Sequence, residues 1–296
     1  MILYDSCPVC GQKNIYRVLS AEDFTVSHEW FEIWECRDCT LRFTQNVPDA
    51  GEIGPYYKSE TYISHSDTRE GFINKIYHQV REHTLIQKKR LIENLTPGST
   101  GPNSILDVGS GTGAFLDTMK RSGWEVTGLE PDDNARKKAA ELYQLSLESS
   151  ENLFSLPAET FDAISMWHVL EHVHQLHDYL KQLKKLLKPG GKLFIAMPNY
   201  TSFDQHIYKE YWAAYDVPRH LYHFSPEAMN KLLSLNDMQL ALTKPMWFDS
   251  FYVCMLSEQY KSGKFNFFKA ILNGGISNLK ALFDIQRCSS VIYVAH

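Results

Sequence analysis

Apolar and polar positions along the chain form an alternating pattern from about residue 70 onward. Short apolar runs lie near residues 104–108, 125–129, 145–147, 161–167 and 191–197, and each has the length of a buried strand. The segments between them repeat their apolar residues at helical spacing, and a similar pattern from about 70 to 95 predicts helices that cover the sheet edge or cap a cofactor. This alternation is typical of a parallel sheet covered by helices, so it predicts an α/β fold.

The part of the chain after residue 198 departs from this alternation. An insertion over 198–224 is followed by a predicted helix over 226–235, a strand near 238–244 and a last apolar strand over 290–294. The segment Phe265–Leu272, with Lys264 and Lys269, fits either a helix packed on the protein's own core or one that rests on a membrane surface. The first arrangement is the more common one, so we expect this segment to be packed.

A glycine-rich segment follows the first predicted strand. Ile105–Val108 leads into Gly109, Gly111 and Gly113, after which helical spacing begins. Glycines let the backbone turn sharply and approach a ligand closely, so this order predicts a nucleotide pocket. The same glycines also fit the pattern of dinucleotide-binding enzymes, and by themselves they do not identify the ligand.

Two acidic residues indicate which nucleotide is bound. Asp107 would repel a pyrophosphate, but it would suit a ligand that carries an ammonium and a sulfonium, as S-adenosylmethionine does. Glu130 ends the second predicted strand, where a carboxylate can accept hydrogen bonds from both ribose hydroxyls of either cofactor. S-adenosylmethionine is therefore the expected cofactor.

At this point the chain resembles the class I S-adenosylmethionine-dependent methyltransferases, over roughly residues 70–296. Further matching motifs lie at Phe161–Ile164, Leu170–His172 and Leu186–Leu193. The resemblance implies a Rossmann-like sheet that is mostly parallel and is closed by an antiparallel strand. The expected cofactor-binding residues are Asp107, Gly109, Gly111, Gly113, Glu130 and Trp167. The alternative is a Rossmann-like domain that holds another ligand.

Four cysteines near the N-terminus form two Cys-x-x-Cys pairs, Cys7 with Cys10 and Cys36 with Cys39. This spacing predicts a zinc ribbon, because four thiolates can complete a tetrahedral shell around one Zn²⁺. Such a zinc has no open position, so its role would be structural. Two redox dithiols or two disulfides are the alternatives. We expect a zinc-ribbon module over 1–50, an aromatic linker with capping helices over 51–100, and the donor-binding domain over 101–296.

Composition narrows the range of partners. The chain has 296 residues, 44% of them hydrophobic, and a formal net charge of −5, with no long run of like charges. Nucleic acid is therefore not an expected partner, and a small-molecule acceptor is. We find no apolar run long enough to span a bilayer and no signal-peptide pattern, so we expect a cytoplasmic protein without stable membrane insertion. The oligomeric state stays open.

Histidines are the candidate catalytic residues. The site of an open α/β sheet lies beyond the carboxyl ends of its strands, which points to His168 and His172 after the fourth strand and to the insertion after the fifth. His168 to His172 also fits a zinc-hydrolase pattern, but that chemistry needs a helix interior, and here a strand ends just before His168. In the insertion, His220 is a candidate base and Arg219 a candidate ligand for a phosphate or carboxylate. Ordinary structural roles remain possible for all of these residues.

The zinc-binding start and the histidines of the insertion resemble sugar methyltransferases that act on nucleotide-linked deoxysugars. That resemblance implies a base role for His220 and a supporting role for His172. Quinone and other small-molecule O-methyltransferases match the region from Pro218 to Ser225 equally well. A protein that binds S-adenosylmethionine without catalysis, and uses the ribbon as a docking surface, is the alternative of another class.

Overall fold

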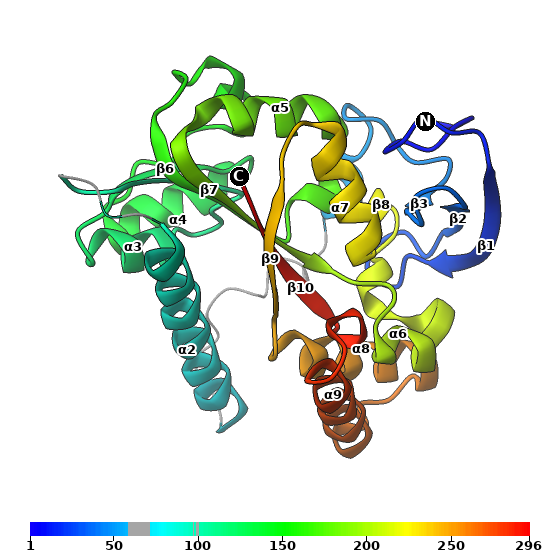
Figure 1. Cartoon of the computed structure of the whole chain (residues 1–296). Helices are drawn as coiled ribbons and strands as arrows, with labels where there is room; N and C mark the ends of the chain where they lie inside the picture. Colours follow the sequence, from blue (N-terminus) through cyan, green and yellow to red (C-terminus); the bar gives the residue numbers. More distant parts are fainter. Residues whose placement is uncertain (59–71, 97, 99–100) are drawn as a thin grey trace.

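The computed structural model describes residues 1–58, 72–96, 98 and 101–296, and a six-stranded sheet lies at its centre (Figure 1). The strand order is β5-β4-β6-β7-β10-β9. The strands are β4 (Ser104–Val108), β5 (Glu125–Leu129), β6 (Phe161–Trp167), β7 (Leu187–Pro198), β9 (Leu240–Pro245) and β10 (Ser290–Ala295). Neighbours among β5, β4, β6 and β7 pair in parallel, whereas β10 is antiparallel to both β7 and β9. The expected mostly parallel sheet with a closing antiparallel strand is confirmed.

Helices cover both faces of this sheet. The helices are α2 (Phe72–Leu95), α3 (Ala114–Lys120), α4 (Asp133–Tyr143), α5 (Leu176–Leu186), α6 (Phe203–Tyr208), α7 (Pro226–Leu235), α8 (Asp249–Ser262) and α9 (Phe267–Ala281). Side chains of successive strand residues point to opposite faces, so Ile105 packs with α2, α3 and α4 while Leu106 packs with α5 and α7. The expected helical segment from 70 to 95 is α2, although residues 70 and 71 lie outside the described residues.

Two strand expectations differ from the structure. Residues 145–147 form no strand, and only an isolated bridge joins Leu129 to Glu148, because Leu145 and Leu147 instead turn into the apolar cluster beside α3 and α4. Strand β7 begins at Leu187 rather than near 191. Leu187 pairs with Phe161 and Lys192 with Ala163, so the pairing with β6 continues across a register shift that accommodates the additional residues of β7.

A second sheet joins the N-terminal segment to the insertion. It contains β1 (Ile15–Glu22), β2 (Trp30–Cys36), β3 (Arg42–Thr44) and β8 (Tyr222–His223), in the order β1-β2-β3-β8. Because β8 belongs to the insertion over 198–224, strand pairing ties that insertion to the N-terminal segment. Six 3₁₀ helices connect the described elements: η1 (Gly54–Tyr57), η2 (Ser150–Ser155), η3 (Leu170–His172), η4 (Lys209–Tyr211), η5 (Ala213–Tyr215) and η6 (Ile285–Arg287).

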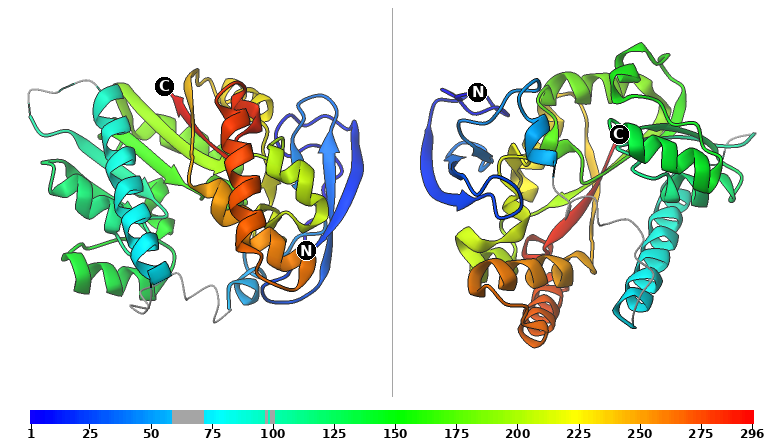
Figure 2. Two further views of the ribbon diagram at one scale, coloured as in Figure 1. Left: turned by 90° about the horizontal axis from the view of Figure 1, so that it is seen from below. Right: turned by 180° about the vertical axis from the view of Figure 1, so that it is seen from behind.

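A helical hairpin of α8 and α9 lies between β9 and β10 in the sequence. Figures 1 and 2 show α9 projecting beyond the sheet on the same side as α2. The expectation that Phe265–Leu272 packs on the core is wrong for most of the segment: Ala270 is buried, whereas Phe265, Phe268 and Leu272 are exposed. The buried residues of α9 are small, Ala270, Gly274, Ser277 and Ala281, whereas most of its large apolar side chains are exposed. No helix among the described residues is long and apolar enough to cross a membrane.

Candidate functional site

The glycine-rich segment between β4 and α3 leaves its backbone open toward the end of the sheet. Gly109 has φ +74°, and an added Cβ would lie 2.4 Å from Cγ2 of Val169. Gly113 caps α3 with φ +81°. Both positions therefore require glycine, for conformation and for space. A Cβ at Gly111 would meet nothing within 4 Å, so the segment is open at Gly111.

Asp107 lies buried beside this segment. The Ser165 hydroxyl donates a hydrogen bond of 2.5 Å to its Oδ1. Burial raises the pKa of Asp107 to about 7, against the effects of the Ser165 hydrogen bond and the positive charge of Lys88. A buried carboxylate whose pKa is raised by burial is stabilised in its charged form by a cationic ligand, which is what a sulfonium and an ammonium provide.

Glu130 connects the end of β5 to the same segment. Its Oε2 accepts a hydrogen bond of 2.7 Å from the Gly111 N–H, and its Oε1 accepts one of 3.0 Å from the Asp132 N–H. Each carboxylate oxygen can accept a further hydrogen bond. The carboxylate is thus held in a fixed position at the strand end and keeps capacity for ribose hydroxyls.

Lys88 of α2 lies beside the candidate site residue Trp167, and the sequence analysis did not single it out. Its Nζ lies 4.2 Å from the centroid of the Trp167 ring, and burial lowers its pKa while Asp249 and Asp107 raise it. The Trp167 Nε1–H is buried and has no hydrogen-bond partner among the described residues. A lysine in an amphipathic helix usually faces solvent, so nothing in the local pattern marked Lys88.

A cavity of about 210 Å³ adjoins Lys88. Apolar side chains including Leu91, Met246 and Ile292 form much of its wall, and Asp249 adds a carboxylate. The cavity therefore offers an apolar surface together with two cations, Lys88 and Lys244, and the Asp249 carboxylate.

The partly exposed His168 pairs with two carboxylates, Asp249 of α8 and the buried Glu171 of η3. Its Nε2 lies 2.9 Å from Oδ2 of Asp249, and its Nδ1 lies 3.5 Å from Oε1 of Glu171. Burial opposes the charge of the ring, but the two carboxylates outweigh it and raise the pKa of His168 to about 10. A doubly protonated ring has no lone pair, so His168 is poorly suited to accept a proton at neutral pH.

His172 and His220 lie on the other side of Glu171. Their ring centroids are 4.6 Å apart, and one ligand atom each of Glu171, His172 and His220 lies within 4.8 Å of the others. His220 Nδ1 is 2.9 Å from the Ala214 carbonyl oxygen, which only accepts, so in the neutral ring Nδ1 carries the proton and Nε2 has the lone pair. Burial and the neighbouring His220 lower the pKa of His172 to about 4.

Arg219 does not have the role that the sequence suggested. Its side chain is buried, and it donates to both carboxylate oxygens of Asp216, to Asp23 at 2.8 Å, to Thr25 and to the Tyr56 carbonyl oxygen at 2.8 Å. With its guanidinium engaged in these bonds, Arg219 is unsuited to bind an acceptor phosphate. It acts as a structural connection between the insertion and the loop after β1.

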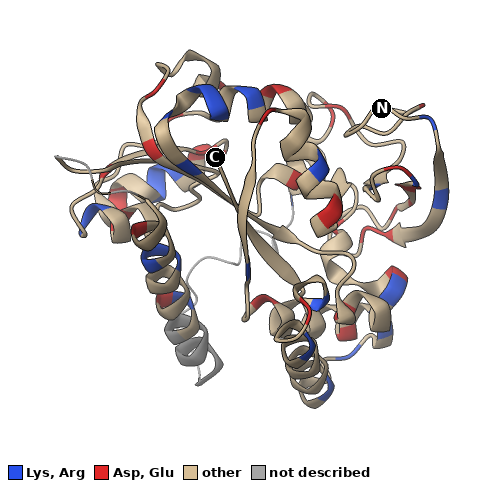
Figure 3. Ribbon diagram, in the orientation of Figure 1, with Lys and Arg blue, Asp and Glu red and all other residues tan. Residues whose placement is uncertain are grey.

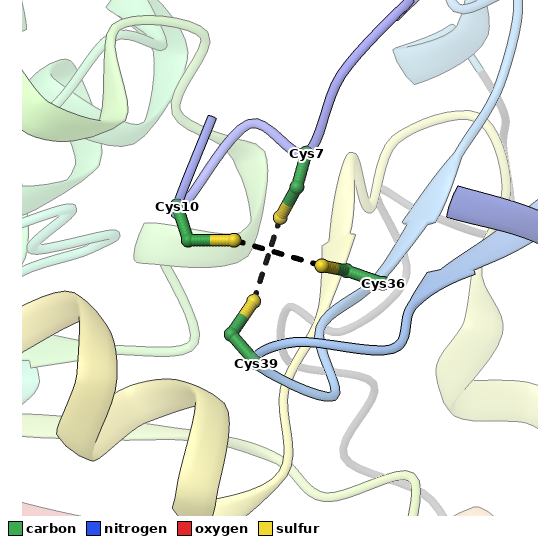
Figure 4. A group of neighbouring side chains, drawn as sticks. All are labelled: Cys7, Cys10, Cys36 and Cys39. Atoms are coloured by element: carbon green, nitrogen blue, oxygen red, sulfur yellow. Dashed lines mark hydrogen bonds between the residues drawn. The ribbon is translucent and has the colours of Figure 1, made fainter. Parts of the chain in front are cut away.

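The four N-terminal cysteines converge on one point (Figure 4). The Sγ atoms of Cys7 and Cys39 are 3.5 Å apart, and those of Cys10 and Cys36 are 3.6 Å apart. A tetrahedral Zn²⁺ with zinc–sulfur bonds of about 2.3 Å separates its sulfurs by about 3.8 Å, so the arrangement fits zinc.

The second cysteine turn departs from the first at Thr40, which takes a left-handed conformation with φ +59° where the first turn has Gly11. The Thr40 side chain shares a hydrogen bond of 2.7 Å with Ser225, and the Tyr200 hydroxyl donates to the Thr40 carbonyl oxygen at 2.5 Å. Thr40 thus attaches this turn to the larger domain.

Comparison with known proteins identifies the family. A family model described as a methyltransferase domain matches residues 78–242, more than half of the chain. The chain belongs to this methyltransferase family. The resemblance to class I S-adenosylmethionine-dependent methyltransferases is therefore confirmed, and with it the Rossmann-like fold.

Several curated relatives are quinone-biosynthesis enzymes. The methyltransferase is 30% identical over 164 residues to the human mitochondrial ubiquinone biosynthesis O-methyltransferase, covering 50% of this chain and 44% of that protein. It is 38% identical over 108 residues to the ubiquinone biosynthesis O-methyltransferase of Actinobacillus pleuropneumoniae, covering 33% and 46%. A demethylmenaquinone methyltransferase of Tropheryma whipplei is 32% identical over 102 residues, covering 33% and 43%. The chain thus spans less than half the length of these relatives.

Solved structures agree on the fold. A putative sarcosine dimethylglycine methyltransferase from Galdieria sulphuraria superposes with a TM-score of 0.50 at 13% identity, covering 73% of this chain and 85% of that one. A putative methyltransferase of Haloferax volcanii, in complex with the Trm112 activator, gives 0.50 at 12% identity, covering 73% and 87%.

Proposed function

We propose that this chain transfers a methyl group from S-adenosylmethionine to a small-molecule acceptor. The observation that carries the proposal is the pair of buried carboxylates, Asp107 and Glu130, on either side of the open glycine-rich segment. Asp107 would face the cationic methionyl part of the donor and Glu130 its ribose. When bound, the donor supplies a methyl group already activated by the sulfonium.

The protein's own task is then to align the acceptor and to exclude water. Trp167 is proposed to line the donor, with its buried Nε1–H available to a ligand acceptor atom. Lys88 is a cation placed for the carboxylate end of the donor, because its Nζ lies over the Trp167 ring and near Asp107.

His220 is the proposed base for an acceptor hydroxyl. Its Nδ1–H is directed to the Ala214 carbonyl oxygen, which leaves Nε2 to accept the proton. His172 would support it, because a neutral ring beside His220 adds no competing positive charge. Glu171, buried between the two rings and His168, would stabilise the charge that His220 gains. We propose that His168 positions Glu171.

For the acceptor, we propose a ring of the quinone-precursor type rather than a nucleotide-linked sugar. Two observations favour it: Arg219 is engaged in structural bonds, and the cavity beside Lys88 has apolar walls. The names of the relatives point the same way.

We further propose one structural Zn²⁺ on Cys7, Cys10, Cys36 and Cys39, in a module over residues 1–50 that precedes the linker over 51–100 and the donor-binding domain over 101–296. All four ligands come from the chain, so the metal would stabilise the fold and take no part in methyl transfer.

Titration calorimetry with S-adenosylmethionine and with NAD tests the proposal. We expect binding of the former only, and turnover with a phenolic quinone precursor when a panel of acceptors is supplied. Preferential NAD binding would contradict the donor assignment. Tight donor binding without transfer to any phenolic or sugar-nucleotide acceptor would instead support a protein that binds S-adenosylmethionine without catalysis.

A further inference from the structure

The outward face of α9 is apolar, the reverse of the usual pattern for a surface helix. Its small residues Ala270, Gly274, Ser277 and Ala281 are buried, and Gly274 lies against Phe251 of α8. The opposite side carries large apolar side chains. This exposed apolar face consists of Phe267, Phe268, Ile271, Leu272 and Leu279 of α9, with Phe265 just before the helix and Leu282 and Phe283 just after it.

The exposure of this face is high. Phe268 is 86% exposed and Phe283 is 88% exposed. Phe268, Leu272, Leu279 and Phe283 follow one another at helical spacing of four, seven and four residues, so they form one continuous stripe. Scattered exposed apolar residues need no explanation, but a continuous stripe on one helix indicates a binding surface.

Positive charge surrounds the stripe. The exposed residues Lys261, Lys264, Lys269 and Lys280 lie on or beside α9, and the chain has no Asp or Glu from 259 to 283. Figure 3 shows blue and no red along α9, in a chain whose net charge is −5. A protein partner could match the apolar stripe alone, but the lysines add a preference for an anionic surface. A second copy of the same face would bring like charges together, which disfavours self-association.

The hairpin is held firmly and is connected to the site. Asp204 accepts hydrogen bonds from Ser277 at 2.9 Å and from Ser289 at 2.8 Å, and Asn273 donates to the Tyr208 hydroxyl at 2.9 Å. Asp249, the first residue of α8, pairs with His168. The apolar face therefore belongs to a hairpin that is held to the rest of the chain and whose first residue, Asp249, pairs with His168 of the candidate site.

We propose that the apolar face of α9 binds the protein to an anionic lipid surface, with the phenylalanines in the boundary between headgroups and acyl chains and the lysines among the headgroups. This binding would be peripheral, since no described helix spans a bilayer. This proposal does not depend on the assignment of the donor site.

Vesicle co-sedimentation of the full chain tests this proposal, with phosphatidylcholine vesicles and with vesicles that also contain phosphatidylglycerol. We expect binding to the mixed vesicles that weakens with added salt. The double variants Phe268→Ser/Phe283→Ser and Lys264→Glu/Lys269→Glu should each lower the partition coefficient about tenfold or more. Leu142→Ser/Lys137→Glu, which changes exposed residues of α4, is the matched control and should bind as the unchanged protein does.

The proposal would be overturned if the protein did not bind mixed vesicles, or if it bound both vesicle types equally. It would also be overturned if the protein formed an oligomer that only Phe268→Ser/Phe283→Ser converted to a monomer, because the face would then be an interface between copies. Calorimetry with S-adenosylmethionine separates this from the proposed function. If the unchanged protein does not bind S-adenosylmethionine, the proposed function alone is contradicted. The vesicle result still decides whether the apolar face of α9 binds lipid.

Discussion

Arg219 and Asp23 are 196 residues apart in the sequence, yet Nη2 of Arg219 lies 2.8 Å from Oδ1 of Asp23 in the buried interior. Asp23 caps the loop after β1 through the backbone N–H groups of Thr25 and Ser27. The ion pair therefore joins the N-terminal segment to the loop that carries His220. Any loss at this pair should disturb the candidate base as well as the fold.

Arg219→Ala should lower the free energy of unfolding by about 3–5 kcal/mol, because it leaves the buried Asp23 and the partly buried Asp216 without their partner. Chemical denaturation measures the change. Arg287→Ala, at an exposed arginine, is the control and should change stability by less than about 1 kcal/mol. If Arg219→Ala is as stable as the unchanged protein and only its KM for the acceptor is raised, the result would support Arg219 as a ligand of an acceptor phosphate.

Asp107 should make donor affinity depend on pH. Its pKa is raised to about 7 by burial, and a bound cation favours the deprotonated form. Binding of S-adenosylmethionine should therefore release a proton, and affinity should rise as the pH increases through about 7. Calorimetry across this range measures it. Asp107→Asn should bind more weakly by about 1–3 kcal/mol and should lose this part of the pH dependence; an unchanged pH profile in the variant would argue against the assignment.

His220→Ala should lower turnover about 10²-fold or more and leave donor affinity nearly unchanged, since proton removal acts in the transition state. Steady-state kinetics and calorimetry together distinguish the two effects. His168→Ala and His172→Ala are the comparison variants. If His220→Ala keeps normal turnover and His172→Ala loses turnover, the base would be His172 of η3.

His168 should contribute a pH-dependent part of the stability. Its pKa in the fold is raised from the ordinary value of 6.5 to about 10, so its ion pairs stabilise the fold fully below about pH 6.5 and this stabilisation is lost as the pH rises through about 10. The thermal unfolding temperature of the unchanged protein should therefore fall over this pH range by more than that of His168→Gln. His28→Gln, at an exposed histidine, should follow the unchanged protein.

Elemental analysis should find one zinc ion per chain in the unchanged protein and less in Cys36→Ser. The N-terminal sheet should lose stability with the metal, because the binding energy of a structural zinc is largely folding energy. Donor binding should persist, since Asp107 lies on β4 and Glu130 directly follows β5, both in the other sheet. Cys254→Ser, at a buried cysteine outside the cluster, should keep the metal; full zinc content in Cys36→Ser would refute the assignment.

The sequence by itself determined the features whose signal is local. A short apolar run before Gly109, paired cysteines and helical spacing over 226–235 each depend on neighbouring residues, and β4, the cysteine cluster and α7 form where expected. The run over 145–147 was too short for its local pattern to decide between a strand and a turn into the core.

Only the tertiary structure decided which distant side chains meet. It paired His168 with Asp249, brought Lys88 over Trp167, engaged Arg219 with Asp23 and joined β8 to β3. It also left the large side chains of α9 exposed, although an apolar segment usually packs inward. Burial and ion pairing depend on what lies opposite a residue in space, and no pattern within one segment of the chain contains that information.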